Sequence, residues 1–286
     1  MAGAPVNAHR VRMLDELRAK YNRREFVHPD PLEFLYAYED LRDREVVGLI
    51  ASSLAYGRVK CILRSVARVL ERMDPPARFL DEVSDAALFD TFRDFRHRVT
   101  SGETLSVMLL GAKRVISHYG TLGACFKAGL GEEDETVFPA LARFVDELTL
   151  AAGRCPTHLL PAPDKGGACK RLNLFLRWMV RCDEVDPGGW PDVPAAKLVI
   201  PLDTHMHAMG RRLGFTKRKQ ADRRTALEIT SAFRSIAPDD PVRYDFALTR
   251  LGIRKDADLE GFPRASDMMT SSARGRARRS SGEEAD

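Results

Sequence analysis

The sequence predicts an all-α protein, and three observations support this fold class. Apolar residues recur at helical spacing along most of the chain, for example Val46, Ile50 and Leu54. Helix-start signals precede several of these runs, and no stretch of useful length alternates polar and apolar residues as a strand does. The 286 residues, 44% of them hydrophobic, are enough for one large core or two packed helical lobes.

The first predicted helix starts at Asp30, an N-cap residue followed by Pro31 at the first helical position and Glu33 three residues after the cap. Gly57 interrupts the next helical run. We expect the other helices over residues 43–56, 62–73, 77–83, 86–98, 104–118, 137–152, 170–181 and 204–213.

The domain prediction is a single helical domain of two lobes over residues 1–265. Residues 266–286 contain few large apolar side chains, so this Arg- and Ser-rich tail is expected to be disordered. Its arginines, from Arg274 to Arg279, either add affinity for a polyanion or simply keep the terminus solvated.

The cysteine spacing and the lack of long apolar runs argue against several classes of protein. The five cysteines form no Cys-x-x-Cys pair, which disfavours a zinc ribbon or a disulfide framework. No apolar run has the length of a membrane span, and residues 1–10 do not resemble a signal peptide, so we expect a cytoplasmic protein without a membrane partner.

The net charge is only +4, but basic residues gather in two stretches that suit a phosphate backbone or, alternatively, coat a solvated face. These residues are Lys165, Lys170, Arg171, Arg177, Arg181, Arg211, Arg212, Lys217, Arg218 and Lys219.

A turn rich in proline and glycine precedes the helix that begins at Lys170. Gly166 and Gly167 in this turn would expose backbone N–H groups that can hold a phosphate oxygen, although similar turns join many helix pairs for packing reasons alone. Leu172, Phe175, Leu176 and Met179 fall on one side of the helix. Its polar residues Lys170, Asn173, Arg177 and Arg181 fall roughly opposite, on a side expected to be accessible.

Asp203 is placed to cap the helix that ends at Gly214. A carboxylate at a helix N-terminus is stabilised as the anion, which suits either a plain cap or a group that faces a developing cation. His205 and His207 lie two residues apart on this helix and diverge, so no metal site is expected.

These segments resemble the helix-hairpin-helix DNA glycosylase superfamily, which includes endonuclease III and the 8-oxoguanine glycosylases. The segment Pro-Leu-Asp203-Thr-His-Met-His with Arg211-Arg-Leu-Gly214 is close to the family's Val-Asp-Thr-His-Val helix. Leu160-Pro161 with Gly166-Gly167 and Lys170 is a loose, longer version of the family's Leu-Pro-Gly-x-Gly-x-Lys hairpin. The chain as a whole also looks like an uncharacterised prokaryotic family of unknown function.

The resemblance implies two helical lobes with the hairpin between them, and a DNA base-excision glycosylase with AP-lyase activity. It gives Asp203 the role of the essential carboxylate and Lys170 that of the nucleophile, with Lys165 as the rival lysine. Asp203 follows Lys170 by 33 positions, a spacing that resembles that of the archaeal 8-oxoguanine branch, which makes 8-oxoguanine our first choice of lesion.

The remaining site residues also follow from the resemblance, and each of them has a plain structural alternative. The implied DNA-binding residues are Tyr56, Arg58, Lys165, Gly166, Gly167, Arg171 and His205. The implied base-pocket residues are Tyr244, Asp245 and Phe246.

The resemblance implies double-stranded DNA as the partner, a monomer, and a nucleoid-associated place in the cytoplasm. It requires no cofactor, although the family's hairpin often holds a monovalent cation. No cysteine follows Cys182, so the iron–sulfur cluster of some endonuclease III relatives is not expected.

Two other interpretations stay open: a non-catalytic helix-hairpin-helix DNA-binding protein, and a helical scaffold that binds protein or RNA through its basic stretches.

Overall fold

The computed structural model describes residues 8–154 and 157–253. Most of these residues are helical, so the all-α prediction is confirmed. The predicted tail at residues 266–286 lies outside the described residues, as does the end of the predicted domain.

The α-helices are α1 (Ala8–Tyr21), α2 (Leu41–Ser53), α3 (Val59–Leu70), α4 (Pro76–Glu82), α5 (Asp85–Phe92), α6 (Gly102–Tyr119), α7 (Leu122–Ala128), α8 (Phe138–Ala152), α9 (Lys170–Val180), α10 (Thr204–Arg212), α11 (Arg223–Arg234) and α12 (Asp245–Ile253). Short 3-10 turns occupy Arg24–Phe26, Pro31–Ala37, Thr157–Leu159, Pro163–Lys165 and Ala195–Lys197. Strands β1 (Arg96–His97) and β2 (Thr100–Ser101) form an antiparallel hairpin.

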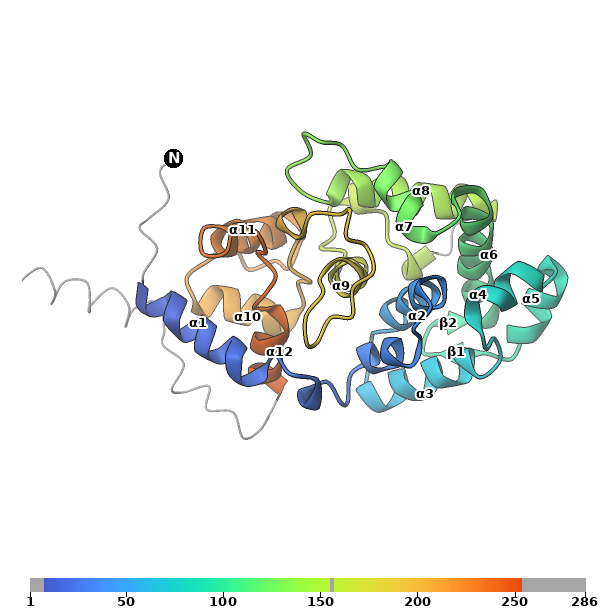
Figure 1. Cartoon of the computed structure of the whole chain (residues 1–286), viewed down its shortest axis with the longest axis horizontal. Helices are drawn as coiled ribbons and strands as arrows, with labels where there is room; N and C mark the ends of the chain where they lie inside the picture. Colours follow the sequence, from blue (N-terminus) through green and yellow to red (C-terminus); the bar gives the residue numbers. More distant parts are fainter. Residues whose placement is uncertain (1–7, 155–156, 254–286) are drawn as a thin grey trace, which may run out of the picture.

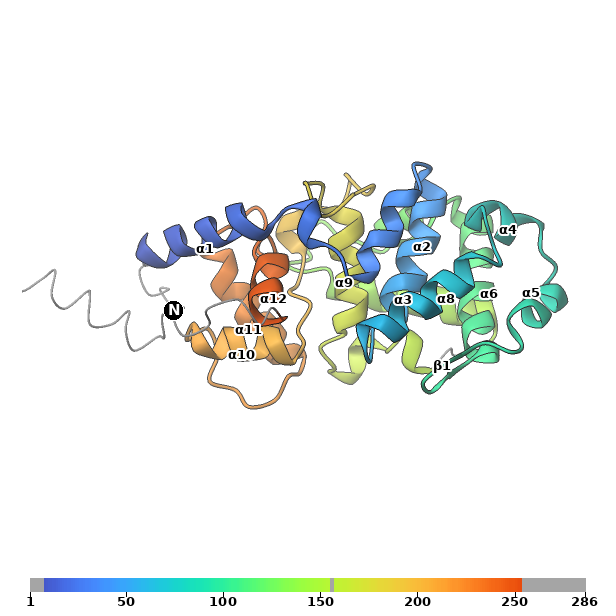
Figure 2. The same ribbon diagram turned by 90° about the horizontal axis from the view of Figure 1, so that it is seen from below.

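The helices form two groups with α9 between them (Figure 1). Helices α1, α10, α11 and α12 make up one group, and α2 to α8 make up the other (Figures 1 and 2). Helix α9 packs along α2, and its apolar residues from Leu172 to Val180 are buried. The central position of α9 therefore places its two ends on opposite faces of the molecule.

Two predicted helices differ in the structure. Residues Pro31–Ala37 form a 3-10 helix, although Asp30 caps it as expected by accepting from the Leu32 amide at 3.0 Å. The helix predicted over 86–98 ends at Phe92 because the chain turns back on itself: Gly102 packs so closely on the Phe92 carbonyl that a Cβ would lie 1.7 Å from its oxygen. The reversal forms the β1–β2 hairpin, which sequence periodicity missed because each strand is only two residues long.

The polar side of α9 is buried, which corrects the prediction of an accessible face. Asn173, Arg177 and Arg181 are at most 5% exposed, and only Lys170 at the start of the helix is half-buried. The prediction failed because helical spacing shows which residues share a side, whereas neighbouring helices here cover both sides of α9. Arg177 and Arg181 consequently do not belong to any surface that contacts phosphate.

A buried ion-pair network compensates for these two arginines. Asp186, which is fully buried, accepts from Arg177 Nε at 3.1 Å and from Arg181 Nη1. Arg177 Nη1 also donates to Asp245 Oδ2 of α12 at 2.5 Å, and Arg181 donates to Asp240 Oδ2 at 2.9 Å. The network thus joins α9 to the loop that follows it and to α12, since a buried charge is tolerated only when it is paired.

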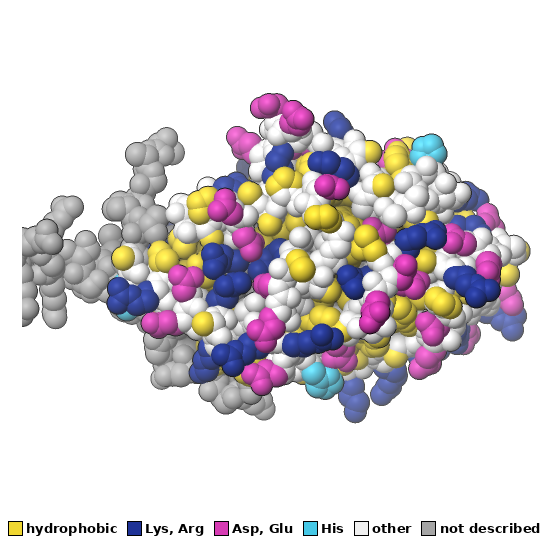
Figure 3. All heavy atoms as spheres, viewed as in Figure 1, with side chains coloured by type: hydrophobic (Ala, Val, Ile, Leu, Met, Phe, Trp, Pro, Cys, Tyr) yellow, Lys and Arg dark blue, Asp and Glu magenta, His cyan; other side chains and the backbone are white. Residues whose placement is uncertain are grey.

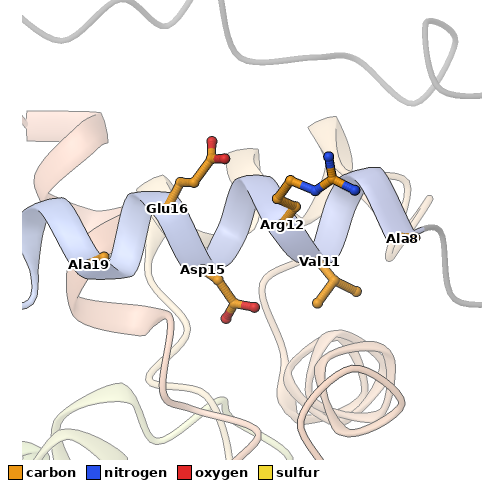
Figure 4. A pocket seen from close by; sticks show the side chains of 6 residues that line it. All are labelled: Ala8, Val11, Arg12, Asp15, Glu16 and Ala19. Carbon is orange, nitrogen blue, oxygen red and sulfur yellow. The ribbon is translucent and has the colours of Figure 1, made fainter.

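Helix α1 is held against the same region by polar contacts. The Tyr244 hydroxyl donates to Asp15 Oδ1 at 2.8 Å, and Asn22 Nδ2 donates to Asp183 Oδ2 at 3.0 Å. Asp15 and Val11 extend from one side of α1, and Arg12 and Glu16 from the other (Figure 4). Asp183 also accepts from Arg181, so α1 is connected to the buried network.

We predict that Asp186→Ala lowers the free energy of unfolding by about 3 kcal/mol, because it leaves two buried guanidinium groups short of a carboxylate. Urea denaturation would measure the change. Asp94→Ala is the matched control, since its pair with Arg72 is exposed to solvent and should contribute little to the free energy of unfolding. Equal losses in the two variants would contradict a structural role for the network.

Candidate functional site

Lys170 and Asp203 meet at the start of two helices. The Lys170 Nζ lies 3.9 Å from Asp203 Oδ2, and their side chains are 30% and 29% exposed. Lys170 is the first residue of α9, and Asp203 is the N-cap of α10. The fold thus brings together the two residues to which the resemblance gave catalytic roles, and leaves both accessible.

The two oxygens of Asp203 serve different partners. Oδ1 accepts from the backbone amides of His205 at 3.0 Å and Met206 at 2.9 Å, which is the predicted cap. Oδ2 is the oxygen that faces Lys170. Because the cap uses only Oδ1, the carboxylate can hold α10 and still present a charged oxygen to a ligand.

The turn before Lys170 is longer than a tight hairpin. Helix α8 ends at Ala152 and α9 begins at Lys170, which leaves 17 residues between them (170 − 152 − 1). Lys165, Gly166 and Gly167 are exposed on this turn. Gly166 has a φ of 80°, in the left-handed region that glycine adopts at little cost.

The turn is fixed by contacts with the loop between α10 and α11. Gly167 forms an antiparallel β-bridge with Asp222, and the Arg223 amide donates to the Gly166 carbonyl at 3.0 Å. On the inner side, Asn173 Nδ2 donates to the Ala168 carbonyl at 3.0 Å. The two glycines predicted to contact DNA therefore lie on an exposed turn whose backbone is held in place by hydrogen bonds.

Tyr56 lies beside the Lys170 end of α9. Its hydroxyl donates to the His97 carbonyl at 2.9 Å and lies 2.5 Å from Thr100 Oγ1. The guanidinium of Arg171 lies 5.0 Å from the Tyr56 ring centroid. These contacts fix the β1–β2 hairpin next to the residue that follows Lys170.

Arg171 is engaged within the protein. It is half-buried and donates to the carbonyls of Ser53 and His158. Burial lowers the pKa of Arg171 from its ordinary value. Its predicted contact with DNA would have to coexist with these bonds, whereas Arg58 and His205 are exposed and open to a ligand.

The hairpin carries features that our sequence analysis did not single out. Val99, at its tip, is 73% exposed, and Arg96 and Arg98 beside it are exposed as well. The sequence offered only the short segment Arg96-His97-Arg98, in which the structure buries His97 and exposes the two arginines. Three residues are too few to predict a strand.

Two residues other than glycine have a left-handed backbone among the described residues: one directly precedes Lys170, and the other lies in the hairpin that Tyr56 contacts. Arg98 in the hairpin has a φ of 54°, and Cys169, directly before Lys170, has a φ of 47°. Such conformations cost free energy and concentrate at functional sites. Their positions support a function for the surface around Lys170.

The three predicted base-pocket residues are buried. Tyr244 and Phe246 are each 2% exposed, and the Arg250 guanidinium lies 4.6 Å from the Phe246 ring centroid. Asp245 is also 2% exposed, and its Oδ1 has no hydrogen-bond partner. These residues lie in the interface between α12 and its neighbours, so only Asp245 retains a polar atom free for a further contact.

Asp245 is electrostatically coupled to the Lys170–Asp203 pair. Burial raises its pKa to about 6, against the opposing effect of Arg177. The negative charge of Asp203 raises the pKa further, and Lys170 lowers it. A third titratable group, the carboxyl of Asp245, thus lies within the electrostatic field of the pair.

Two surface hollows lie away from the pair. One runs along α1 and is lined by Val11 and Asp15 (Figure 4). The other, of about 490 Å³, lies between α7 and the loop after α9 and is lined by Glu45 and Trp190. Glu45 Oε1 there accepts from Trp190 Nε1 at 2.6 Å, and both Glu45 oxygens accept from backbone amides of α7. This buried carboxylate therefore has a structural role, since it connects α2 with α7 and with the loop after α9.

The part of the chain that the structure describes contains neither a candidate metal cluster nor a candidate membrane span. No group of three or more His, Cys, Asp or Glu side chains there is arranged to hold a metal ion. No helix of residues 8–154 and 157–253 has the length and apolar character needed to cross a membrane.

These features define an all-α protein with a partly exposed lysine–carboxylate pair between two groups of helices. Residues 30–254 match a family described as "Protein of unknown function (DUF2400)", and the chain belongs to that family. No curated protein and no solved structure matches the chain.

We predict that Asp203→Ala lowers the free energy of unfolding by about 1 kcal/mol, because the amides of His205 and Met206 lose their acceptor. Asp203→Asn should stay within about 0.5 kcal/mol of the wild type, since an amide oxygen also caps a helix. Thermal and urea denaturation of both variants would test this. A loss of stability in the Asn variant as large as in the Ala variant would show that the charge, not the cap, stabilises the fold.

The raised pKa of Asp245 predicts a dependence of stability on pH. The folded state favours the protonated carboxyl group, so the stabilisation by Asp245 is complete below about pH 4 and is lost as the pH rises through about 6. The unfolding free energy of the wild type, minus that of Asp245→Asn, should fall by roughly 2 kcal/mol between pH 4 and 7. A difference that instead rises with pH would mean that pairing with Arg177 outweighs burial.

Proposed function

We propose that this protein is a DNA base-excision glycosylase with AP-lyase activity. One observation carries the proposal: Lys170 Nζ and Asp203 Oδ2 lie 3.9 Å apart, each about 30% exposed, at the ends of two helices. The sequence around each residue resembles the matching segment of the helix-hairpin-helix DNA glycosylases. A lysine and a carboxylate in this relation can supply a nucleophile and an electrostatic stabiliser.

Asp203 would stabilise the transition state of base release. Breaking the bond between the base and C1′ leaves positive charge on the deoxyribose, and an ionised carboxylate nearby lowers that barrier. Two backbone amides at the α10 N-terminus donate to Oδ1 of Asp203 and hold the side chain in place. Oδ2 is therefore held in a position from which it would face the developing sugar cation.

Lys170 would act as the nucleophile. Its amine, after losing a proton to solvent, forms a bond to C1′ as the base leaves with the bonding electron pair and takes up a proton. Loss of a further proton from the nitrogen and opening of the sugar ring give a Schiff base. Loss of a proton from C2′ to solvent then forms the C2′=C3′ double bond as the 3′ phosphate leaves with the C3′–O bonding pair. Lys165 is the rival nucleophile, but the ion pair with Asp203 belongs to Lys170.

Duplex DNA is the proposed substrate, and the target base would be flipped out of the helix at a cost of about a few kcal/mol. The hairpin residues Arg98 and Val99 and the neighbouring Tyr56 and Arg58 form a basic and apolar edge beside Lys170 that could contact the opened duplex. We take 8-oxoguanine as the first lesion to test. Asp245, whose buried Oδ1 has no hydrogen-bond partner, would contact the extruded base only if the side chains that cover it moved apart.

A non-catalytic DNA-binding protein is the second candidate. The 17 residues between α8 and α9 favour it, since the turn is looser than the hairpin that the resemblance implies. The same experiment separates the two proposals.

We predict that borohydride traps a covalent adduct between the wild-type protein and a duplex oligonucleotide that carries 8-oxoguanine or an abasic site. Lys170→Gln should abolish the adduct, whereas Lys165→Gln should still form it once the duplex is saturating, since Lys165 would contribute only to binding. Asp203→Asn should slow base release by about 10²–10³-fold, the usual effect of removing one transition-state stabiliser. Denaturing gel electrophoresis would measure both adduct and product.

Duplexes with uracil or an oxidised pyrimidine extend the panel to other lesions. Base release without an adduct would support a monofunctional glycosylase, in which Asp203 activates water. No base release from any lesion, with duplex binding retained by all variants, would favour the DNA-binding protein.

A further inference from the structure

The loop between α10 and α11 forms a fixed ridge next to the turn that precedes Lys170. His207 Nε2 lies 3.0 Å from the Arg218 carbonyl, and the Phe215 amide donates to the Gly210 carbonyl at 2.8 Å. The β-bridge from Asp222 to Gly167 connects the loop to the turn. We call residues 163–167 and 215–222 the ridge.

The ridge presents cations without internal partners. Lys165, Lys217 and Lys219 are exposed, and none of them lies in an ion pair within the described residues. Arg218, by contrast, donates to Asp222 Oδ2 at 2.7 Å and thereby stiffens the loop. Asp164 is the one exposed acid of the ridge, so the ridge keeps a net positive charge.

The other side of the Lys170–Asp203 pair is basic as well. Residues 55–64 and 96–102, which we call the hairpin edge, contain no acidic residue. Arg58, Lys60, Arg64, Arg96 and Arg98 are exposed on this edge. A Cβ on Gly57 would lie 2.7 Å from Arg98 Cδ, so this glycine lets the hairpin pack closely against the start of α3.

The ridge and the hairpin edge lie on the same face of the molecule. In Figure 2 the hairpin and the loop after α10 both project from the lower side, and the start of α9 lies between them. The opposite face, where α9 ends, carries a mixture of acidic and basic side chains (Figure 3). On the face that holds Lys170, the exposed basic residues of the ridge and the hairpin edge outnumber the one exposed acid of these two segments, Asp164.

We propose that the ridge is a second duplex-binding arm, which holds the phosphate backbone on the side of the Lys170–Asp203 pair opposite the hairpin edge. The inference rests on the proposed function, because it takes duplex DNA as the ligand. A duplex that lies across this face contacts the ridge on one side and the hairpin edge on the other. Its central base pairs then lie over the Lys170–Asp203 pair. The substrate is thus a base inside a continuous duplex, with paired DNA on both sides.

The exposed groups of the ridge are best suited to bind phosphate groups. Three exposed ammonium groups on a backbone fixed by a β-bridge match a repeating anion, and they contact it without sequence preference. The ridge exposes no large apolar residue or aromatic ring that would stack on bases or bury a protein partner.

The test measures binding of the full-length protein to an undamaged fluorescent duplex at several salt concentrations. Lys217→Gln/Lys219→Gln should lower the slope of log affinity against log salt by about 2, and weaken binding at least tenfold at 0.1 M salt. Arg58→Gln/Arg98→Gln on the hairpin edge should have a similar, additive effect. Lys20→Gln on α1 is the matched control and should change neither quantity, because Lys20 is exposed outside both arms.

A salt slope unchanged by Lys217→Gln/Lys219→Gln, with normal duplex binding by the wild type, would overturn the second arm and leave the glycosylase proposal intact. Failure of the wild type to bind duplex DNA would overturn both. Stronger binding to structured RNA than to the duplex would also overturn the proposal. A duplex truncated on either side of a central lesion should bind more weakly than the full duplex, and equal affinities would contradict the two-arm arrangement.

Discussion

The pairing of Arg177 and Arg181 with Asp186 is the interaction on which the arrangement of the helices depends. A helix at the centre of a protein with two buried guanidinium groups is tolerated only where carboxylates reach it from the surroundings. Those carboxylates come from the loop after α9, from α12 and from the segment before α12. Electrostatic compensation therefore fixes α9 against the group of helices that contains α10.

The position of α9 in turn determines the site. Since α9 is held along its buried length, Lys170 at its first residue can lie only where the helix emerges. Asp203 reaches the same place from an independent constraint, the need of α10 for an N-cap. A charged pair at the junction of two helix ends is a consequence of these two packing requirements, and it leaves one carboxylate oxygen available for chemistry.

The burial of some basic residues and the exposure of others also explain why positive charge is unevenly distributed over the surface. Several basic residues of the chain are neutralised inside the protein, as Arg177 and Arg181 show, while the exposed basic residues of the hairpin edge and the ridge outnumber the one exposed acid there, Asp164. The net charge of the chain is only +4, but the ridge and the hairpin edge are locally much more basic than this value indicates. A polyanion would sense that local charge, because screening limits electrostatic interaction to about 10 Å at ordinary salt concentrations.

The sequence by itself determined the helical class, most helix positions and the cap at Asp203, because these depend on spacing and on residues close together in the chain. It also singled out Lys170 and Asp203. Only the tertiary structure decided that Arg177 and Arg181 are internal, that residues 96–101 reverse as a hairpin, and that the turn at Gly167 pairs with Asp222. The physical reason is that burial and long-range pairing depend on which distant segments meet, and local periodicity carries no information about that.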